Sequence, residues 1–327
     1  MTKTVDIGRK MAERGIFTDD KGGFKSDKEI KREAALNGEL YPIYKDGVVR
    51  PKTLHDYIYQ AEERKKSMIE MSEISKNYLN IELPESSILV FTGDWHYGDL
   101  QTKNERILQE IEAVKNSPNT YIVLLGDLLN GIFWGGESQS EEVSNMNEQR
   151  GFIKAVFKEL KGKILWAHSG EHDSKWAAKT GADPYTMLID EAGAPYIRGV
   201  GEIVVNIGDQ EYKIVSQHKA SGHSMYNKNH PTYKEARFTL QNSDIYVSAH
   251  NHQKQVSQEA IRKFGNQSSC VTHIAIGPYK TKDSYGDRSG FVPQTEEQMY
   301  GVAVKLHKRN KIVELEPDIL RAIERWT

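Results

Sequence analysis

The sequence predicts an α/β protein in which two packed β-sheets are flanked by helices. From residue 88 onward, short apolar runs of strand length alternate with stretches whose apolar residues recur at helical spacing. After Gly201 the pattern changes to consecutive strands separated by turn residues, which is typical of antiparallel hairpins and meanders. Strand–helix units followed by meanders favour two layers of sheet covered by helices.

The composition is that of a globular protein in a reducing compartment. The 327 residues suffice for one large domain, or for one domain with an appendage. No apolar run of about 18 residues occurs, so we expect no membrane span and no membrane partner. The first six residues carry no apolar signal core, and Cys270 is the single cysteine. We therefore expect a cytoplasmic protein without disulfides, in the host cytoplasm if it is phage-encoded.

Residues 1–82 differ from the rest of the chain and predict a mainly helical appendage. Residues 26–36 and 53–78 combine helical periodicity with dense alternating charge. Between them, residues 41–49 fit a short hairpin around Asp-Gly. No chemical motif occurs here, so we expect an arm of unknown function that could serve oligomerisation or bind a protein partner. The main domain is expected over residues 83–327.

The main domain is expected to contain a definite series of strands and helices. Polar turns separate them, and each helix shows an apolar stripe. A hairpin around Gly-Asp is predicted after the mixed region. The expected strands are residues 87–91, 121–125, 163–167, 203–205, 212–216, 245–247, 271–276, 300–306 and 311–315, and the expected helices are residues 104–115, 147–160 and 183–191.

Five apolar strands each end in an acidic, amide or imidazole side chain. Because strand ends at one sheet edge converge, we expect these side chains to share a small volume. A site for two adjacent metals needs about six to eight such ligands, including one bridging carboxylate. Oxygen and imidazole ligands without thiolates favour Mn, with Fe, Zn or Mg as alternatives, over a structural zinc site. The candidate ligands are Asp94, His96, Asp127, Glu171, His218, His250 and His252, with Asn130 as a neighbour.

These motifs together resemble the signature of the calcineurin-like metallophosphoesterase superfamily, which includes phage and bacterial phosphodiesterases and nucleases of DNA repair. The resemblance covers most of residues 88–255 and implies a four-layer α/β/β/α sandwich with two divalent metal ions. The motifs that carry it are Asp94-x-His96, Gly126-Asp127-x-x-Asn130, Gly170-Glu171-His172-Asp173, His218 and Ala249-His250-Asn251-His252.

The resemblance also implies a role for each residue. Asp127 would bridge both ions, and His172, oriented by Asp173, would stand beside the phosphate as electrostatic stabiliser or proton donor. The other ligands would be Asp94, His96 and His252 for one ion, and Glu171, His218 and His250 for the second.

Two positions depart from the family pattern. Ala249 replaces a glycine, which is a mild change if the backbone there has a negative φ. Glu171 replaces an asparagine and adds a negative charge. We expect Glu171 to bind the second metal and to shift metal preference or rate without abolishing activity.

The predicted function is hydrolysis of a phosphoester by a hydroxide activated between two metals. A phosphodiesterase or nuclease acting on DNA or RNA is favoured. The net charge of −2 means that such a substrate would be bound by a local patch. The alternatives are a phosphatase or phosphodiesterase for a nucleotide or other small phosphoester, and a non-catalytic metal-binding scaffold.

The segment after His218 supplies candidate substrate contacts. It offers polar, basic and aromatic groups near the expected metals, although it also fits an ordinary polar loop before a helix starting at Pro231. Trp95, between two ligands, is expected to point into the core. The candidate substrate residues are Lys219, Ser224, Tyr226 and Asn227.

Overall fold

The computed structural model divides the chain into two compact units, Met1–Glu73 and Ile74–Thr327. None of the helices in the described part of the chain is long and apolar enough to cross a membrane. The structure describes residues 44–45, 48–49, 54–55, 57–59, 61–62, 65, 77–131, 141–180, 188, 191–222, 224, 226–262, 268–282, 290 and 292–327.

The first unit contains the expected hairpin. Strands β1 (Tyr44–Lys45) and β2 (Val48–Val49) pair antiparallel, with Tyr44 opposite Val49. Helical residues occur at 54–55, 57–59, 61–62 and 65, within the predicted helix 53–78. The predicted helix 26–36 lies outside the described residues.

The second unit begins before the expected boundary at residue 82. Strand β3 (Tyr78–Leu83) pairs in parallel with β8 (Gly201–Ile207), and so belongs to a sheet of this unit. Leu79 and Leu83 are buried in that unit's core. Residues 78–82 therefore form part of the larger unit rather than of a helical appendage.

The larger unit is an α/β fold with two mixed sheets of six strands each. In the first sheet the order is β14-β13-β4-β5-β6-β7, with β4 to β7 parallel and β13 antiparallel to both of its neighbours. Its strands are β4 (Ser87–Thr92), β5 (Thr120–Leu124), β6 (Ile164–His168), β7 (Tyr196–Ile197), β13 (Val302–Leu306) and β14 (Val313–Glu316).

The second sheet has the order β11-β12-β10-β9-β8-β3. The predicted hairpin around Gly208 is present, because β8 and β9 pair antiparallel. Strand β10 lies between β9 and β12 and is parallel to both. The strands not yet given are β9 (Gln210–Gln217), β10 (Ile245–Ser248), β11 (Gln255–Arg262) and β12 (Ser268–Ala275).

The two sheets face each other across an apolar core. Side chains alternate along a strand, so neighbouring residues point to opposite faces. In β4, Leu89 and Phe91 belong to the core shared with the second sheet, whereas Ile88 and Val90 belong to the core under the helices. Burial on both faces explains why residues 88–91 of β4 form an unbroken apolar run, and every residue of the strand is buried.

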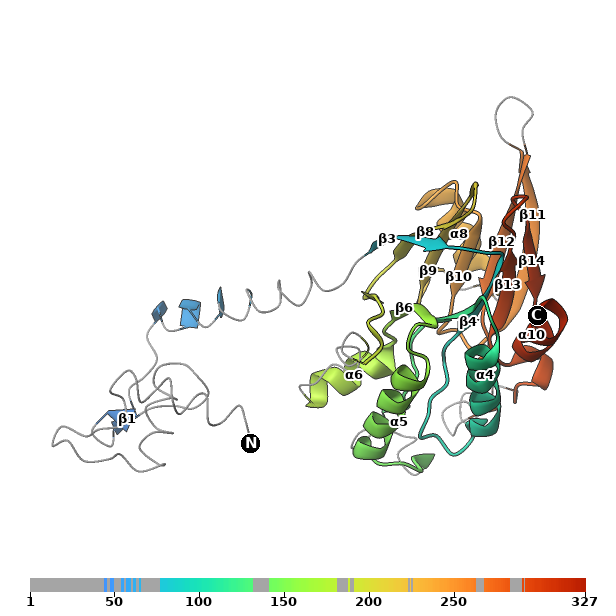
Figure 1. The fold of residues 1–327 in the computed structure, drawn as a ribbon. Coiled ribbons are helices and arrows are strands. Elements are labelled where there is room, and N and C mark those ends of the chain that lie inside the picture. Colours follow the sequence, from blue (N-terminus) through green and yellow to red (C-terminus); the bar gives the residue numbers. More distant parts are fainter. Residues whose placement is uncertain are drawn as a thin grey trace. The chain divides into compact units, whose positions relative to one another are not determined.

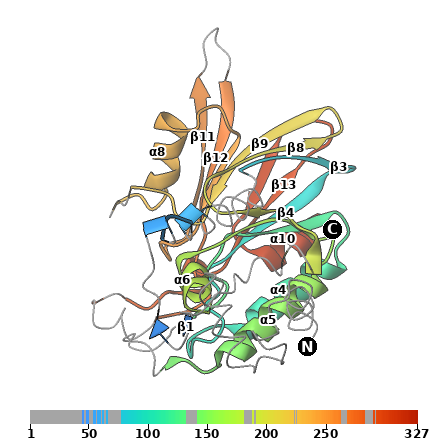
Figure 2. The same ribbon diagram turned by 90° about the vertical axis from the view of Figure 1, so that its left-hand side faces the viewer.

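Helices cover the outer faces of both sheets (Figure 1). Helices α4, α5 and α10 pack on the first sheet. Helix α8 packs on the second, where it lies beside β11 and β12 in Figure 2. The bounds are α4 (Asn104–Asn116), α5 (Met146–Glu159), α6 (Glu171–Thr180), α8 (His230–Phe238) and α10 (Ile319–Trp326), with a 3-10 turn η3 (Glu296–Gln298).

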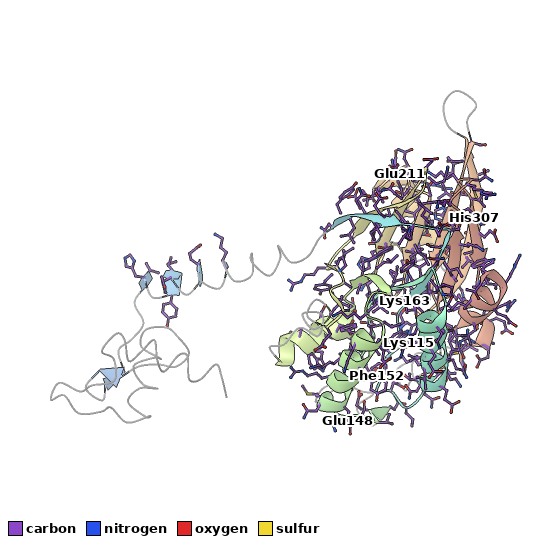
Figure 3. All side chains as sticks on the ribbon, in the orientation of Figure 1. Lys115, Glu148, Phe152, Lys163, Glu211 and His307 are labelled. Atoms are coloured by element: carbon purple, nitrogen blue, oxygen red, sulfur yellow. The ribbon has the colours of Figure 1, made fainter. Side chains whose placement is uncertain are left out.

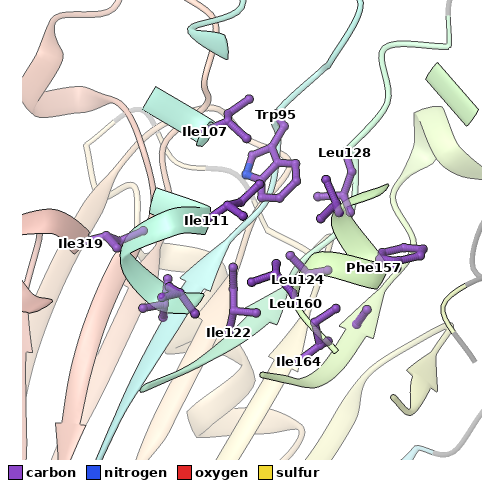
Figure 4. Close-up of a cluster of buried hydrophobic side chains, with 14 of the residues drawn as sticks. Trp95, Ile107, Ile111, Ile122, Leu124, Leu128, Phe157, Leu160, Ile164 and Ile319 are labelled. Carbon is purple, nitrogen blue, oxygen red and sulfur yellow. The ribbon is translucent and has the colours of Figure 1, made fainter. Parts of the chain in front are cut away.

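The core under the helices includes Trp95, as predicted. Trp95 is 1% exposed and packs with Ile107 and Ile111 of α4, as Figure 4 shows. Its Nε1–H donates to Thr92 Oγ1 at 2.8 Å. Trp95 is therefore a core residue that anchors the segment between Asp94 and His96.

Polar contacts tie the outer helices together and to the sheet. Lys115 of α4 pairs with Glu159 of α5, and Lys163 Nζ donates to the Ser117 carbonyl at 2.5 Å (Figure 3). Capping residues set the helix starts, since the Asn145 side chain accepts from the backbone of α5 in a capping box. The predicted helix 183–191 falls mostly outside the described residues.

Candidate metal centre

The predicted ligands come from strand ends of both sheets rather than from one sheet edge. Asp94 and His96 follow β4, and Asp127 follows β5 in the first sheet. His218 follows β9, and His250 and His252 follow β10 in the second. The facing sheets bring these carboxyl ends together, as in Asp94 Oδ2, which accepts from the backbone N–H of His250 at 2.8 Å.

The backbone at these ligands is unusual. Asp94, His96, Asp127, His250 and His252 all have positive φ, between 49° and 70°. Non-glycine residues rarely adopt this region, and such strain is concentrated at functional sites. Ala249 is not among the described residues with positive φ, which meets the condition under which alanine is tolerated there.

Asp94, His96 and His252 form one group in which each residue offers a ligand atom within 4.8 Å of the others. The Nε2 atoms of His96 and His252 lie 3.0 Å apart. Two nitrogens that each lie about 2.1 Å from one ion would be about 3.0 Å apart at a right angle. The spacing of the two imidazoles therefore fits two ligands of one metal.

Asp127, His218 and His250 form a second group by the same criterion. His218 Nδ1–H donates to the Leu125 carbonyl at 2.7 Å, which directs Nε2 toward Asp127 Oδ2 at 3.3 Å. A backbone carbonyl holding the second ring nitrogen is the usual arrangement for a metal-binding histidine.

The two groups adjoin each other and contain buried atoms that lack partners. His218 Nδ1 lies 3.9 Å from Asp94 Oδ1, so a residue of each group touches the other. Asp94 Oδ1 and His218 Nε2 are buried without a hydrogen-bond partner. Burying unpaired carboxylates costs several kcal/mol per ion, unless a cation compensates. The donor set and its unpartnered atoms fit divalent metal ions.

Burial and mutual repulsion act strongly on the two carboxylates. Burial raises the pKa of Asp94 to about 7, and the nearby Asp127 raises it further, against the opposing effect of His218. Burial alone would also raise the pKa of Asp127, but His218 and His172 hold it well below its usual range. Asp127 is therefore the carboxylate that keeps its charge most firmly.

Three of the four histidines in the two ligand groups are held neutral, as metal ligation requires. Burial, and then the nearby Lys280, lowers the pKa of His252 to about 3 and that of His96 well below its usual range. Burial and His218 lower the pKa of His250. His218 is the exception: burial opposes it, but Asp127 raises its pKa to about 9, so His218 would have to release a proton to bind a metal.

His172 lies beside the first group. Its ring meets that of His96 edge-on, with centroids 4.6 Å apart. Its Nδ1 donates to the Asn130 carbonyl, and its backbone N–H donates to Asp127 Oδ1 at 2.8 Å. With Nδ1 engaged, Nε2 is the nitrogen left for a substrate oxygen.

Asp173 binds backbone groups of the neighbouring turns, and its expected role in orienting His172 stays a prediction. Its buried carboxylate accepts from the backbone N–H groups of Asp127 at 2.7 Å and Gly170 at 3.0 Å. Asp173 lies in the first turn of α6, where its carboxylate joins the loops after β5 and β6. It therefore positions the backbone of the bridging candidate Asp127.

Glu171 is not among the residues of either metal-binding group, and its expected role as a ligand of the second metal stays a prediction. Lys219 Nζ donates to Glu171 Oε1 at 2.5 Å. That hydrogen bond, partly opposed by desolvation, lowers the pKa of Glu171, and His250 contributes to the lowering. Glu171 is thus near the second group, but it is bound to a lysine.

Of the remaining candidate residues, Asn130 lies in the buried site, and Ser224, Tyr226 and Asn227 lie in the loop after β9. Asn130 is fully buried, donates from Nδ2 to Glu142 at 2.9 Å and leaves Oδ1 without a partner. Ser224 Oγ accepts from the backbone of Tyr226 and Asn227, and Asn227 Oδ1 accepts from Asn229, so these side chains shape their own loop. Tyr226 is 96% exposed.

Lys280 was missed by the sequence interpretation. It is 5% exposed, pairs with Asp99 at 3.4 Å and lowers the pKa of His96 and His252. It follows β12, the neighbour of β10. A search for polar side chains after the ends of apolar strands, which identified the candidate ligands, would therefore also have identified Lys280. A search for metal ligands alone passes over it, because lysine is not among the ligand types.

No protein-family model matches the chain, and no curated protein matches it. Among solved structures, it is similar to "GAP50 the anchor in the inner membrane complex of Plasmodium", with 12% identity and a TM-score of 0.35, over 71% of this chain and 84% of that chain. A likeness at that TM-score carries no argument about fold or function.

Proposed function

We propose that this protein is a dinuclear-metal phosphoesterase of the calcineurin-like metallophosphoesterase superfamily, acting in the cytoplasm. In this proposal the larger unit is a four-layer α/β/β/α sandwich. The shared core between the sheets and the helices on both outer faces support that architecture.

The adjacency of the two ligand groups carries the proposal. Each group combines a buried carboxylate with two histidines, and 3.9 Å separates His218 Nδ1 from Asp94 Oδ1. Paired metals in hydrolytic sites lie about 3.5–4 Å apart, which requires two ligand groups in contact. A single structural zinc would need one closed set of four ligands instead.

The residues present could perform phosphoester hydrolysis. When bound, two divalent cations supply a water of lowered pKa and neutralise the phosphate oxygens. Asp94, His96 and His252 would hold one ion, and Asp127, His218 and His250 the other. His172, whose Nδ1–H donates to the Asn130 carbonyl, can in its imidazolium form donate a hydrogen bond or a proton from Nε2 to the phosphate or to its leaving group.

A phosphodiester of nucleic acid is the favoured substrate, with Mn as the favoured metal. Oxygen and imidazole ligands suit Mn, Fe and Zn, and no cysteine takes part in either group. Lys219, next to the ligand His218, places a cation beside the second group, where a phosphate chain could contact it.

The test is Mn-dependent hydrolysis of bis-p-nitrophenyl phosphate, and of single- and double-stranded DNA, by the full chain. Asp127→Ala should lower kcat/KM by about 100-fold or more, because it removes a ligand of the second group. His172→Ala should lower kcat by about 100-fold while the bound metal content stays the same. His307→Ala, which removes a histidine paired with Glu314 away from both groups, is the matched control and should keep the full rate.

Three outcomes separate the alternatives. Full activity of Asp127→Ala would refute the proposed site. Hydrolysis of the small diester without cleavage of DNA would favour a nucleotide or other small phosphoester as substrate. Stoichiometric metal binding without hydrolysis of any substrate would favour a non-catalytic scaffold.

A further inference from the structure

A pocket of about 490 Å³ lies directly beside the second ligand group. His218 belongs both to its wall and to that group. Gly170, whose backbone packs against Asp127, also lines it. The pocket therefore opens next to the position at which the proposed reaction would occur.

Among the described residues that line the pocket, three side chains are cationic and one is anionic. Lys175 comes from α6, Arg198 follows β7, and Lys219 follows β9. The anion is Glu171, which pairs with Lys219. Cationic side chains thus outnumber anionic ones among the described lining residues, in a chain whose net charge is −2.

The Glu171–Lys219 pair holds one of these cations at the border between the pocket and the ligand group. Lys219 directly follows His218 of the second ligand group, and both residues line the pocket together with Glu171. An anion in the pocket would thus meet Lys219 on the side that faces the proposed reaction.

The size and lining of the pocket point to the class of group that it accepts. Sites for small ligands measure about 300–1,000 Å³, so 490 Å³ suits a nucleotide-sized group. No phenylalanine, tyrosine or tryptophan is among its described lining residues, whereas base recognition in single strands uses stacking on such side chains. The charged phosphate, rather than the base, is therefore the part that this pocket can hold tightly.

We propose that this pocket binds the nucleotide next to the scissile phosphate, with Lys175, Arg198 and Lys219 around its phosphate group. The inference rests on the proposed phosphoesterase function and defines its substrate class as a phosphoester with a second phosphate nearby. A polynucleotide and a nucleoside polyphosphate share this chemistry. Binding through phosphate alone makes the protein indifferent to base sequence.

The first test compares substrates that have and lack the second phosphate. For the full chain with Mn, kcat/KM is measured on an oligothymidylate, on ATP and on bis-p-nitrophenyl phosphate. For each variant, kcat/KM on the substrate with a second phosphate is divided by kcat/KM on bis-p-nitrophenyl phosphate. Arg198→Ala and Lys175→Ala should each lower this ratio by about tenfold. Lys161→Ala is the control. It removes an exposed lysine that precedes the N-terminal end of β6, whereas the pocket lies at the C-terminal end, and it should leave every ratio unchanged.

The second test measures binding without catalysis. A short fluorescein-labelled oligothymidylate is titrated in EDTA at several salt concentrations, and its anisotropy gives the dissociation constant. Each lost phosphate contact should reduce the slope of log affinity against log salt by about 0.7 for a single strand. Arg198→Ala should show this decrease, and Lys161→Ala should not.

The outcomes distinguish the inference from the function on which it rests. A selective loss for oligothymidylate identifies a polynucleotide, and a selective loss for ATP identifies a nucleoside polyphosphate. Unchanged ratios and an unchanged salt slope in Arg198→Ala and Lys175→Ala would overturn the inference while leaving the phosphoesterase intact. If the unaltered protein hydrolyses nothing, the proposed function fails, and the salt slope alone decides whether the pocket binds phosphate.

Discussion

A single side chain, Glu171, stands where the metallophosphoesterase pattern that the sequence resembles has an asparagine, and its carboxylate accepts a hydrogen bond from Lys219. The lysine balances the added charge, so the second group keeps its own carboxylate, Asp127, and its two histidines. The substitution is thus a charge-compensated change at the edge of the site.

If the proposed dinuclear site is correct, Glu171→Asn should leave the metal content of the protein unchanged at two ions per chain. Neither group loses a ligand atom, and the released Lys219 remains near the pocket. Metal content after dialysis is measured by plasma mass spectrometry. Asp127→Asn serves as the comparison and should lose metal, because it weakens a ligand in the second group. A fall to one Mn in Glu171→Asn would restore the ligand role expected from the sequence.

Which residues could be predicted depended on how local their signal was. Asp94, His96 and Asp127 follow apolar strands within a few residues, so pattern and spacing sufficed to place them at the site. The pairing of Glu171 with Lys219 joins positions 48 residues apart, which no local pattern encodes. The same is true of Asp173, whose partners are backbone groups of a different loop.

At the scale of elements, the strand-to-loop turns after β5 and β6 hold the site. Gly126 has φ of 91°, and a Cβ added there would lie 2.4 Å from the backbone nitrogen of Gly170. These two turns therefore approach more closely than side chains would permit, and Asp173 spans them from α6.

Gly126→Ala should destabilise the protein by about 3 kcal/mol, because both the φ angle and the contact oppose a Cβ. Gly151→Ala is the matched control. Gly151 lies within α5, and a Cβ added there would meet no atom within 4 Å, so alanine should stabilise the protein by about 0.5–1 kcal/mol. Urea unfolding measures the free energy of unfolding of both variants. Equal values for Gly126→Ala and Gly151→Ala would show that the turn at Gly126 can relax to accept a Cβ.

The elements that the sequence concealed share weak or ambiguous patterns. Strand β11 is a mainly polar edge strand, and α10 has only eight residues. Strand β3 directly follows a charged helical pattern, so the sequence predicts it as part of the helical appendage. Its pairing with β8 places it in a sheet instead. Cys270 is exposed and lies near the start of β12, before the buried part of that strand.

At the scale of the whole molecule, the division of strands between two sheets was beyond sequence reasoning, because it depends on long-range pairing. One buried polar contact joins the sheets directly. Ser216 on β9 accepts from Trp166 Nε1 at 3.0 Å and contacts His168 Nε2 at 2.8 Å, both residues being on β6. Ser216 can donate to His168 only while that nitrogen is unprotonated.

The stability of the protein should therefore fall in acid through His168. Burial, with a contribution from His218, lowers the pKa of His168 to about 3 in the folded state, against 6.5 for the ordinary group. Stability from the neutral ring is present above pH 6.5 and is lost as pH falls toward 3. When the pH is lowered from about 8 to 5, the free energy of unfolding of the unaltered protein should fall by about 2 kcal/mol more than that of His168→Gln. Urea unfolding at both pH values tests this, and parallel losses would contradict it.

Strand β4, which leads into the first two ligands, has β13 as its neighbour on one side, and β13 is formed by residues 302–306. While the chain is being synthesised, that edge of a strand with the apolar run 88–91 stays unpaired until residues 302–306 have left the ribosome. A chaperone that shields the nascent edge should consequently raise the yield of native protein, and translation stalled before residue 302 should leave a product prone to aggregate.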